Sequence, residues 1–235
     1  MGYKKIGVLG GMGPESSASF YKKIIRYCQK NYYAVQDSDF PPLFLYSLPL
    51  DGFNELGVVD EKVILKQLFH GLSVLKRSGC DFVVMPCNTI HCFIDELRTR
   101  FSIPILSIVE ETIEKITGNK DNVVGLLGSD TTLKLNLYQG LLHKKGISCI
   151  TPNESEKHHI TSLILEVMSG KVENKTKKNF LSVINRMEEQ SAKAVVFGCT
   201  EIPLAVSQED VNIKVYDTLQ ILAESAVDYS VTSCY

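Results

Sequence analysis

Short valine-rich apolar runs alternate with helical apolar spacings along this chain of 235 residues. The runs stop at glycine, proline or cysteine, which is typical of strands buried on both faces of a parallel sheet. Between the runs, apolar residues recur every three or four positions, the spacing of one buried helix face. The clearest predicted faces are Ile64, Leu68, Leu72 and Leu75; Ile160, Leu163, Ile164 and Val167; and Phe180, Val183, Ile184 and Met187. Strands and helices that alternate in this way predict an α/β fold.

A glycine-rich turn at residues 10–14 follows the first predicted strand, Lys4–Leu9. The helix after this turn is expected to bury Tyr21, Ile24, Ile25 and Cys28. Glycines between a strand and a helix N-terminus favour an anion, because backbone N–H groups point towards it. The turn matches a dinucleotide fingerprint poorly, since Ser16 stands where the third glycine would be. A tight turn that holds a small carboxylate fits better.

The second half of the chain repeats the pattern of the first half. Gly125 lies 118 positions after Gly7 in matching strand sequences, and Cys199 lies 112 positions after Cys87. Each cysteine ends an apolar run, so each is predicted at the carboxyl end of a buried strand, where ligands bind in open α/β sheets. The repeat therefore predicts two similar parallel-sheet lobes related by a pseudo-two-fold axis, with the active site in the cleft between them.

The lobes are assigned from the order of the predicted elements. Residues 1–103 and 213–235 form the expected N-terminal lobe, and residues 104–212 form the expected C-terminal lobe. Within the second lobe, the spacing of Leu133, Leu137 and Leu141 predicts one helix that ends near Gly146.

Composition narrows the range of partners. The chain is 44% hydrophobic and 22% charged, with a formal net charge of -2, which favours neither nucleic acid nor an anionic membrane as partner. No apolar run is long enough to span a bilayer, and the first residues enter a strand-like run without the features of a signal peptide. The basic run at residues 171–178 reads as a solvated helix face. A cytoplasmic protein is expected.

Seven cysteines are scattered without the spacing of a disulfide framework. Cys28, Cys80 and Cys149 lie inside apolar patterns and are expected to be small buried hydrophobes. Cys87 and Cys92 are spaced C-x4-C, which matches no common zinc motif. No metal is expected.

Two thiols facing one small molecule suit racemisation or epimerisation. One thiolate removes the α-proton from one face, and the opposite thiol delivers a proton to the other face. Asn88, Thr89 and Thr200 follow the cysteines and can supply the donors that hold the substrate carboxylate. A Cys–His hydrolase is the competing reading, since His91 lies one helical turn after Cys87. The repeat has no histidine after Cys199, so symmetry favours paired cysteines.

The chain resembles the cofactor-independent aspartate/glutamate racemase family over essentially its full length. The resemblance is carried by residues 6–14, by Pro86-Cys87-Asn88-Thr89 and by Gly198-Cys199-Thr200-Glu201. It implies a two-lobed α/β fold, a homodimer, no pyridoxal phosphate, and a small amino acid as the partner molecule. It also implies Cys87 and Cys199 as the acid/base pair, with substrate bordered by Met12, Gly13, Asn88, Thr89 and Thr200.

The chain departs from the family where an arginine and a lysine are expected to hold the acidic groups of the substrate. Phe53 and Met168 stand at these positions, and Lys171 or His159 is the candidate substitute. The leading hypothesis is a racemase of aspartate, glutamate or a similar small amino acid. A hydantoin racemase, a maleate isomerase, a decarboxylase and a non-catalytic amino-acid-binding protein are the alternatives.

Overall fold

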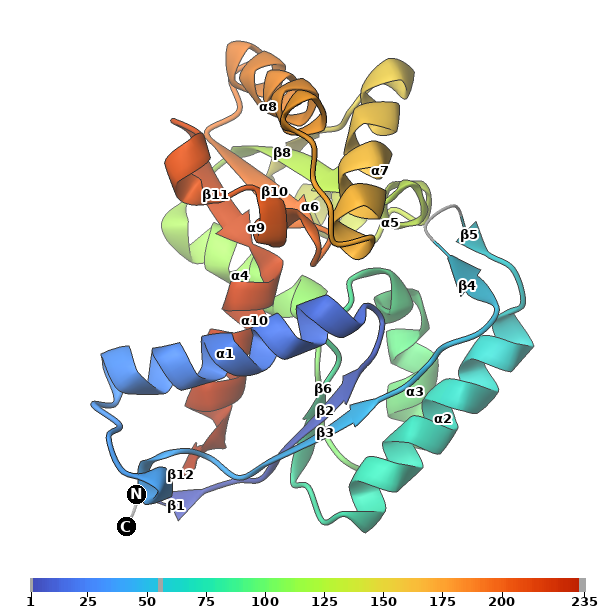
Figure 1. Ribbon diagram of the computed structural model, residues 1–235, viewed down its shortest axis with the longest axis vertical. Coiled ribbons are helices and arrows are strands. Elements are labelled where there is room, and N and C mark those ends of the chain that lie inside the picture. The colour runs from blue at the N-terminus through green and yellow to red at the C-terminus, as the bar shows by residue number, and fades with distance from the viewer. Residues whose placement is uncertain (1, 55–56, 233–235) are drawn as a thin grey trace. The chain divides into compact units, whose positions relative to one another are not determined.

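A computed structural model describes residues 2–54 and 57–232, with the backbone alone at Phe53, Asn54, Val58 and Thr232. The backbone contacts divide the chain into two compact units (Figure 1). The first unit comprises residues up to 53, residues 59–111 and residues from 219 onwards; the second comprises residues 54–58 and 112–218. Each unit is built on its own four-stranded sheet.

The first unit contains a parallel sheet in the order β3-β2-β6-β7. Its strands are β2 (Ile6–Gly10), β3 (Leu43–Ser47), β6 (Phe82–Val84) and β7 (Ile105–Leu106). Helices α1 (Pro14–Asn31) and α10 (Thr218–Ser230) lie on one side of this sheet, and α2 (Glu61–Arg77) and α3 (Ile94–Arg100) lie on the other (Figure 1). The apolar face of α2 is buried as predicted, and Asp60 caps the helix by accepting a hydrogen bond from the N–H of Val63.

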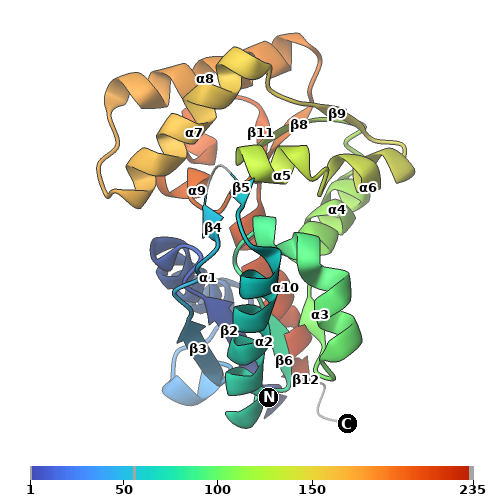
Figure 2. The ribbon, with the colours of Figure 1, turned by 90° about the vertical axis from the view of Figure 1, so that its right-hand side faces the viewer.

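The second unit contains a parallel sheet in the order β11-β10-β8-β9. Its strands are β8 (Val123–Gly128), β9 (Ser148–Ile150), β10 (Ala194–Gly198) and β11 (Lys214–Asp217). Helices α7 (Glu154–Met168) and α8 (Asn174–Glu189) pack side by side (Figure 2). Both predicted apolar faces are buried, and all their residues except Val167 lie in one cluster with Val195 and Phe197 of β10. Helices α4 (Ile108–Asn119), α5 (Asp130–Lys134), α6 (Gln139–Lys144) and α9 (Ile202–Ala205) complete the helices.

Short elements complete the described chain. Strands β1 (Gly2–Tyr3) and β12 (Val231–Thr232) pair antiparallel, and β4 (Phe53–Asn54) pairs with β5 (Gly57–Val58). Single turns of 3₁₀ helix are η1 (Asp37–Asp39), η2 (Thr89–Phe93) and η3 (Gln208–Asp210). Among the residues described, none of the helices is both long enough and apolar enough to cross a membrane.

The two sheets have the same topology, which confirms the internal repeat. Counted along the chain, each sheet places its strands in the order 2-1-3-4. Gly7 pairs with Val83 in the first sheet, and Gly125 pairs with Val195 in the second. These are the residues that the sequence repeat makes equivalent. The predicted α/β fold with two parallel-sheet units is therefore confirmed.

Three details differ from the sequence prediction. Helix α1 buries Phe20, Ile24 and Cys28, whereas Tyr21 is 48% exposed, so the predicted face is rotated by about one residue. The single helix predicted through Leu137 is broken into α5 and α6, because Asn136 adopts a left-handed backbone conformation with φ of 53°. The chain crosses between units after residues 111 and 218 rather than after 103 and 212, since β7 pairs with β6 and β11 pairs with β10.

Candidate active site

The loop after β2 and the turn after β6 lie at the same edge of the first sheet. Strands β2 and β6 are parallel neighbours, so their carboxyl ends point the same way. Met12 and Cys87 emerge there, and both side chains belong to one buried cluster. Gly11 makes the loop possible, since it has φ of +94° and any Cβ would lie 2.4 Å from the carbonyl oxygen of Leu48. Gly13 then caps helix α1, and its carbonyl accepts hydrogen bonds from both the N–H and the hydroxyl of Ser17.

Cys87 is 6% exposed and lies three residues beyond the end of β6. Its N–H donates to the carbonyl oxygen of Met85 at 2.8 Å, which turns the chain sharply after the strand. Asn88 and Thr89 follow at the start of η2 and are buried. The structure therefore brings together four predicted residues of the first unit: Met12, Cys87, Asn88 and Thr89.

Both ring nitrogens of His91 are hydrogen-bonded to the backbone. Nδ1 lies 2.7 Å from the carbonyl oxygen of Cys87, and Nε2 lies 3.3 Å from the backbone nitrogen of Ile108. Because a carbonyl only accepts and an N–H only donates, Nδ1 carries the proton and Nε2 is the acceptor. Burial lowers the pKa of His91 to about 4. The imidazole is neutral and has no nitrogen left to take a proton from Cys87, which removes the basis for a Cys–His hydrolase.

Cys199 occupies the equivalent place in the second unit. It directly follows β10, is 7% exposed, and lies in the cluster that contains Ile160 of α7 and Ile202 of α9. Its thiol donates a hydrogen bond to Oε2 of Glu201 at 3.1 Å, and the hydroxyl of Thr200 donates to the same oxygen at 3.1 Å. Sequence reasoning used Glu201 only as part of a motif, although an acidic residue two positions after a strand-end cysteine is a usable signal.

The other described cysteines are thiols whose surroundings oppose ionisation. Burial raises the pKa of Cys28 and Cys149 to about 11 and that of Cys92 to about 12, and it also raises the pKa of Cys80. Cys234 lies outside the described residues. Within residues 2–54 and 57–232, no three side chains of His, Cys, Asp or Glu come together as ligands for a metal ion.

Each sheet thus presents a buried cysteine after its third strand, followed by amide or hydroxyl side chains. A model of the family described as Asp/Glu/Hydantoin racemase matches residues 9–226 of this chain. The chain belongs to this family. It is accordingly an isomerase of the cofactor-independent amino-acid racemase class, which confirms the resemblance found in the sequence.

Relatives of the Asp/Glu/Hydantoin racemase family match nearly the whole chain. The broad specificity amino-acid racemase RacX of Bacillus subtilis is 31% identical over 222 residues, which cover 94% of this chain and 96% of RacX. An aspartate racemase homologue from Pyrococcus horikoshii has a TM-score of 0.81 at 29% identity, covering 96% of this chain and 98% of its own. The aspartate racemase of Picrophilus torridus has a TM-score of 0.82 at 25% identity, covering 96% and 94% of the two chains.

The residues proposed for the distal group of a racemase substrate lie on or near α7. Met168 is the last residue of α7 and is 50% exposed, and Lys171 is exposed beyond it. His159 is half-exposed, and it precedes Met168 by nine residues, about 14 Å along the helix axis. Lys171 and His159 therefore lie towards opposite ends of α7. The side chain of Phe53 lies outside the described residues.

Two polar groups at the end of β8 were missed by sequence reasoning. Thr131 is 4% exposed, and neither its Oγ1 nor Oδ1 of Asp130 has a hydrogen-bond partner in the described part of the chain. The other carboxylate oxygen of Asp130, Oδ2, pairs with Lys134 at 2.8 Å. Strand β8 is the neighbour of β10, so these groups lie at the same edge of the sheet as Cys199. Their sequence signal was the polar turn that repeats the position of residues 10–14.

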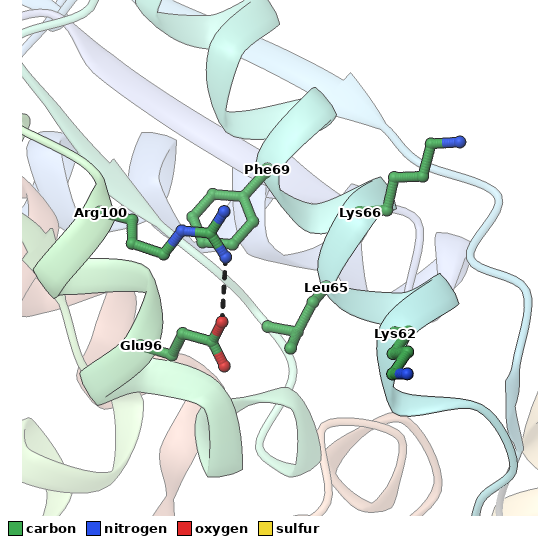
Figure 3. Close-up of a pocket in the computed structure, with 6 residues that line it drawn as sticks. All are labelled: Lys62, Leu65, Lys66, Phe69, Glu96 and Arg100. Carbon is green, nitrogen blue, oxygen red and sulfur yellow. Dashed lines mark hydrogen bonds and ion pairs between the residues drawn. The ribbon is translucent and has the colours of Figure 1, made fainter.

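A surface pocket of about 420 Å³ lies between α2 and α3 in the first unit and contains no predicted site residue. Figure 3 shows Arg100 over the ring of Phe69 and paired with Glu96; the guanidinium carbon lies 4.3 Å from the ring centre, and the ion pair measures 3.1 Å. Leu65, Lys62 and Lys66 complete the lining. The guanidinium of Arg100 is thus held by an aromatic ring and a carboxylate, and the pocket lies outside the candidate active site because no predicted site residue lines it.

Proposed function

We propose that this chain interconverts the enantiomers of a small amino acid by 1,1-proton transfer between Cys87 and Cys199. The supporting observation is positional: each cysteine lies just beyond the third strand of a sheet with the order 2-1-3-4, and each is buried. Equivalent positions in a repeat suit a reaction whose forward and reverse directions exchange the same two roles.

The proposed reaction moves two protons and needs no other reactant. The thiolate of one cysteine removes the proton from Cα, which leaves the electron pair on the substrate as a carbanion conjugated with its carboxylate. The thiol of the other cysteine then donates its proton to the opposite face of Cα. The thiol and thiolate have exchanged places, and the product is the opposite enantiomer.

The carbanion requires donors near the substrate carboxylate, because charge accumulates there in the transition state. Asn88, Thr89 and Thr200 are buried beside the cysteines and are the proposed donors. The hydroxyl oxygen of Thr131 and Oδ1 of Asp130 have no hydrogen-bond partner among the described residues, and they lie at the edge of the sheet that carries Cys199. We assign them to the ammonium group of the substrate, which needs acceptors.

The substrate is proposed to be aspartate, glutamate or a similar small amino acid. Several relatives are named glutamate racemase, whereas RacX is named for broad specificity. The exposed Met168 offers no charge to a distal carboxylate, so neutral amino acids belong in the test beside acidic ones. A panel of enantiopure amino acids and 5-substituted hydantoins, followed by loss of optical activity, identifies the substrate class.

Exchange of the Cα proton in heavy water tests the mechanism. The wild-type chain should bring solvent deuterium into both enantiomers of its substrate, whereas Cys87→Ala and Cys199→Ala should each abolish racemisation in both directions. Cys28→Ala is the matched control, because Cys28 is buried within α1. A single-cysteine variant that keeps near-normal racemisation would contradict the paired mechanism. Binding of amino acids without deuterium uptake would favour the non-catalytic alternative.

A further inference from the structure

Oε2 of Glu201, in the second unit, accepts two hydrogen bonds. The thiol of Cys199 and the hydroxyl of Thr200 both donate to this oxygen at 3.1 Å. Because both partners donate, the oxygen is an acceptor in each bond, as an ionised carboxylate is. Glu201 is 6% exposed. A buried carboxylate is thus in direct contact with one of the two cysteine sulfurs.

The backbone holds this contact in place. Glu201 lies at the N-cap of α9, where its carbonyl oxygen accepts a hydrogen bond from the N–H of Leu204 at 3.0 Å. The carbonyl oxygen of Cys199 accepts from the N–H of Ile202 at 3.3 Å. The surrounding cluster is apolar, and in such surroundings the interaction between a charge and a thiol is stronger than in water. Other titratable residues at or near this edge of the sheet are Asp130, which follows the neighbouring strand β8, Asp217, which ends the other neighbouring strand β11, and the half-exposed His159 on α7, which packs against α9.

The first unit lacks this carboxylate at the equivalent position. The residue two positions after Cys87 is Thr89, whereas the residue two positions after Cys199 is Glu201. Both follow the third strand of their sheets. The repeat therefore places different residue types two positions after the two cysteines: a threonine in the first unit and a glutamate in the second.

We propose that Glu201 is a positioning residue that keeps the proton of the resting enzyme on Cys199, so that Cys87 is the sulfur that starts as the base. The thiol of Cys199 is the donor in its contact with Oε2 of Glu201, so the proton of this contact lies on sulfur. A neighbouring negative charge disfavours the thiolate further. The same carboxylate makes the thiolate of Cys199 a stronger base when catalysis in the reverse direction forms it. This inference rests on the proposed racemase mechanism for its catalytic meaning, and on the Cys199–Glu201 contact for its test.

Alkylation of the two sulfurs as a function of pH tests the inference without turnover. Iodoacetamide reacts with the thiolate, and mass spectrometry of peptides reports each cysteine separately. In the wild-type chain, Cys87 should reach half-maximal alkylation rate at a lower pH than Cys199. In Glu201→Gln, the midpoint for Cys199 should fall by about one pH unit while that for Cys87 stays unchanged. Glu209→Gln, an exposed acidic residue on η3, is the matched control and should shift neither midpoint.

Two results would overturn the inference: a Cys199 midpoint at or below that of Cys87 in the wild-type chain, or an unchanged Cys199 midpoint in Glu201→Gln. The wild-type comparison stands even if the variant does not fold. Failure of racemisation with the expected alkylation profile would contradict the proposed function and leave the role of Glu201 in the titration of Cys199 intact. Racemisation by the two cysteines, with an unchanged Cys199 midpoint in Glu201→Gln, would support the proposed function and contradict the role of Glu201.

Discussion

The carbonyl oxygen of Cys87 lies 2.7 Å from Nδ1 of His91, four residues further along the chain. Through its second nitrogen, the same ring accepts a hydrogen bond from Ile108 at the start of α4. A neutral, buried imidazole thus joins the turn that carries the first candidate catalytic sulfur to a segment seventeen residues away. Since both ring nitrogens bond to the backbone, His91 is hydrogen-bonded to the carbonyl oxygen of Cys87 rather than to its sulfur.

The first prediction concerns acid stability. Burial lowers the pKa of His91 to about 4, whereas the unfolded chain has the ordinary value of about 6.5. Between these values the unfolded state binds more protons, so this contribution to stability is complete above about pH 6.5 and is lost as the pH falls towards 4. The loss should reach about 3 kcal/mol in the free energy of unfolding, measured by urea denaturation across this range.

Two histidine variants isolate this contribution. His91→Gln should be less stable at neutral pH, because a buried imidazole with two backbone partners is lost, but its stability should change less between pH 6.5 and 4. His143→Gln changes an exposed residue and should keep the wild-type pH dependence. Equal pH dependence in wild type and His91→Gln would contradict the prediction.

The second prediction concerns the loop that carries Met12. A Cβ at residue 11 would lie 2.4 Å from the carbonyl oxygen and 2.5 Å from the backbone nitrogen of Leu48, in addition to the strain of a φ of +94°. Gly79 has a φ of +82° with nothing within 4 Å of its Cβ position. Gly79→Ala should therefore cost about 1 kcal/mol of backbone strain, whereas Gly11→Ala should cost several kcal/mol more or prevent folding. Thermal or urea unfolding measures both; similar losses would show that the close approach to Leu48 is unimportant.

The third prediction separates Cys87 from Cys92. Cys92 is half-buried, and burial raises its pKa to about 12, so its thiol stays protonated under ordinary assay conditions. Cys92→Ala should keep kcat/KM within about threefold of wild type, at a cost in stability of about 1 kcal/mol. Cys87→Ala, measured in parallel, should lose racemisation altogether. A folded Cys92→Ala chain without activity would contradict this division of roles.

The fourth prediction concerns the link between α3 and α4. The guanidinium of Arg98 makes two hydrogen bonds of 2.7 Å to Glu110 and also donates to the carbonyl oxygen of Ile105 at 2.8 Å. Lysine cannot make these bonds together, because it lacks the planar fork of donors. Arg98→Lys should lower the free energy of unfolding by about 1 kcal/mol. Arg100→Lys should lower it less, because the ion pair between Arg100 and Glu96 is exposed to solvent. Equal losses of unfolding free energy in the two variants would contradict the prediction that the bonds of Arg98 contribute more than the exposed ion pair of Arg100.

Local periodicity was sufficient for most of the fold. The apolar faces of α2, α7 and α8 were predicted residue by residue, because a helix that packs on a sheet must repeat its buried positions every three or four residues. The boundary between α5 and α6 was not predictable, since the conformation of Asn136 depends on the turn around it. The face of α1 was misplaced because Tyr21 and Phe20 are both large aromatic residues, and packing alone decides which one is buried.

By itself, the sequence determined that the chain is an α/β repeat and that a cysteine follows the third strand of each half, because both properties depend on the local order of residues along the chain. Only the tertiary structure decided the neighbours of those cysteines. The partner of His91 at Ile108 and the contact of Glu201 with Cys199 depend on how turns and strand ends pack. Hydrogen bonds between such side chains depend on distances that residue order does not specify, so their chemistry had to be taken from three-dimensional geometry.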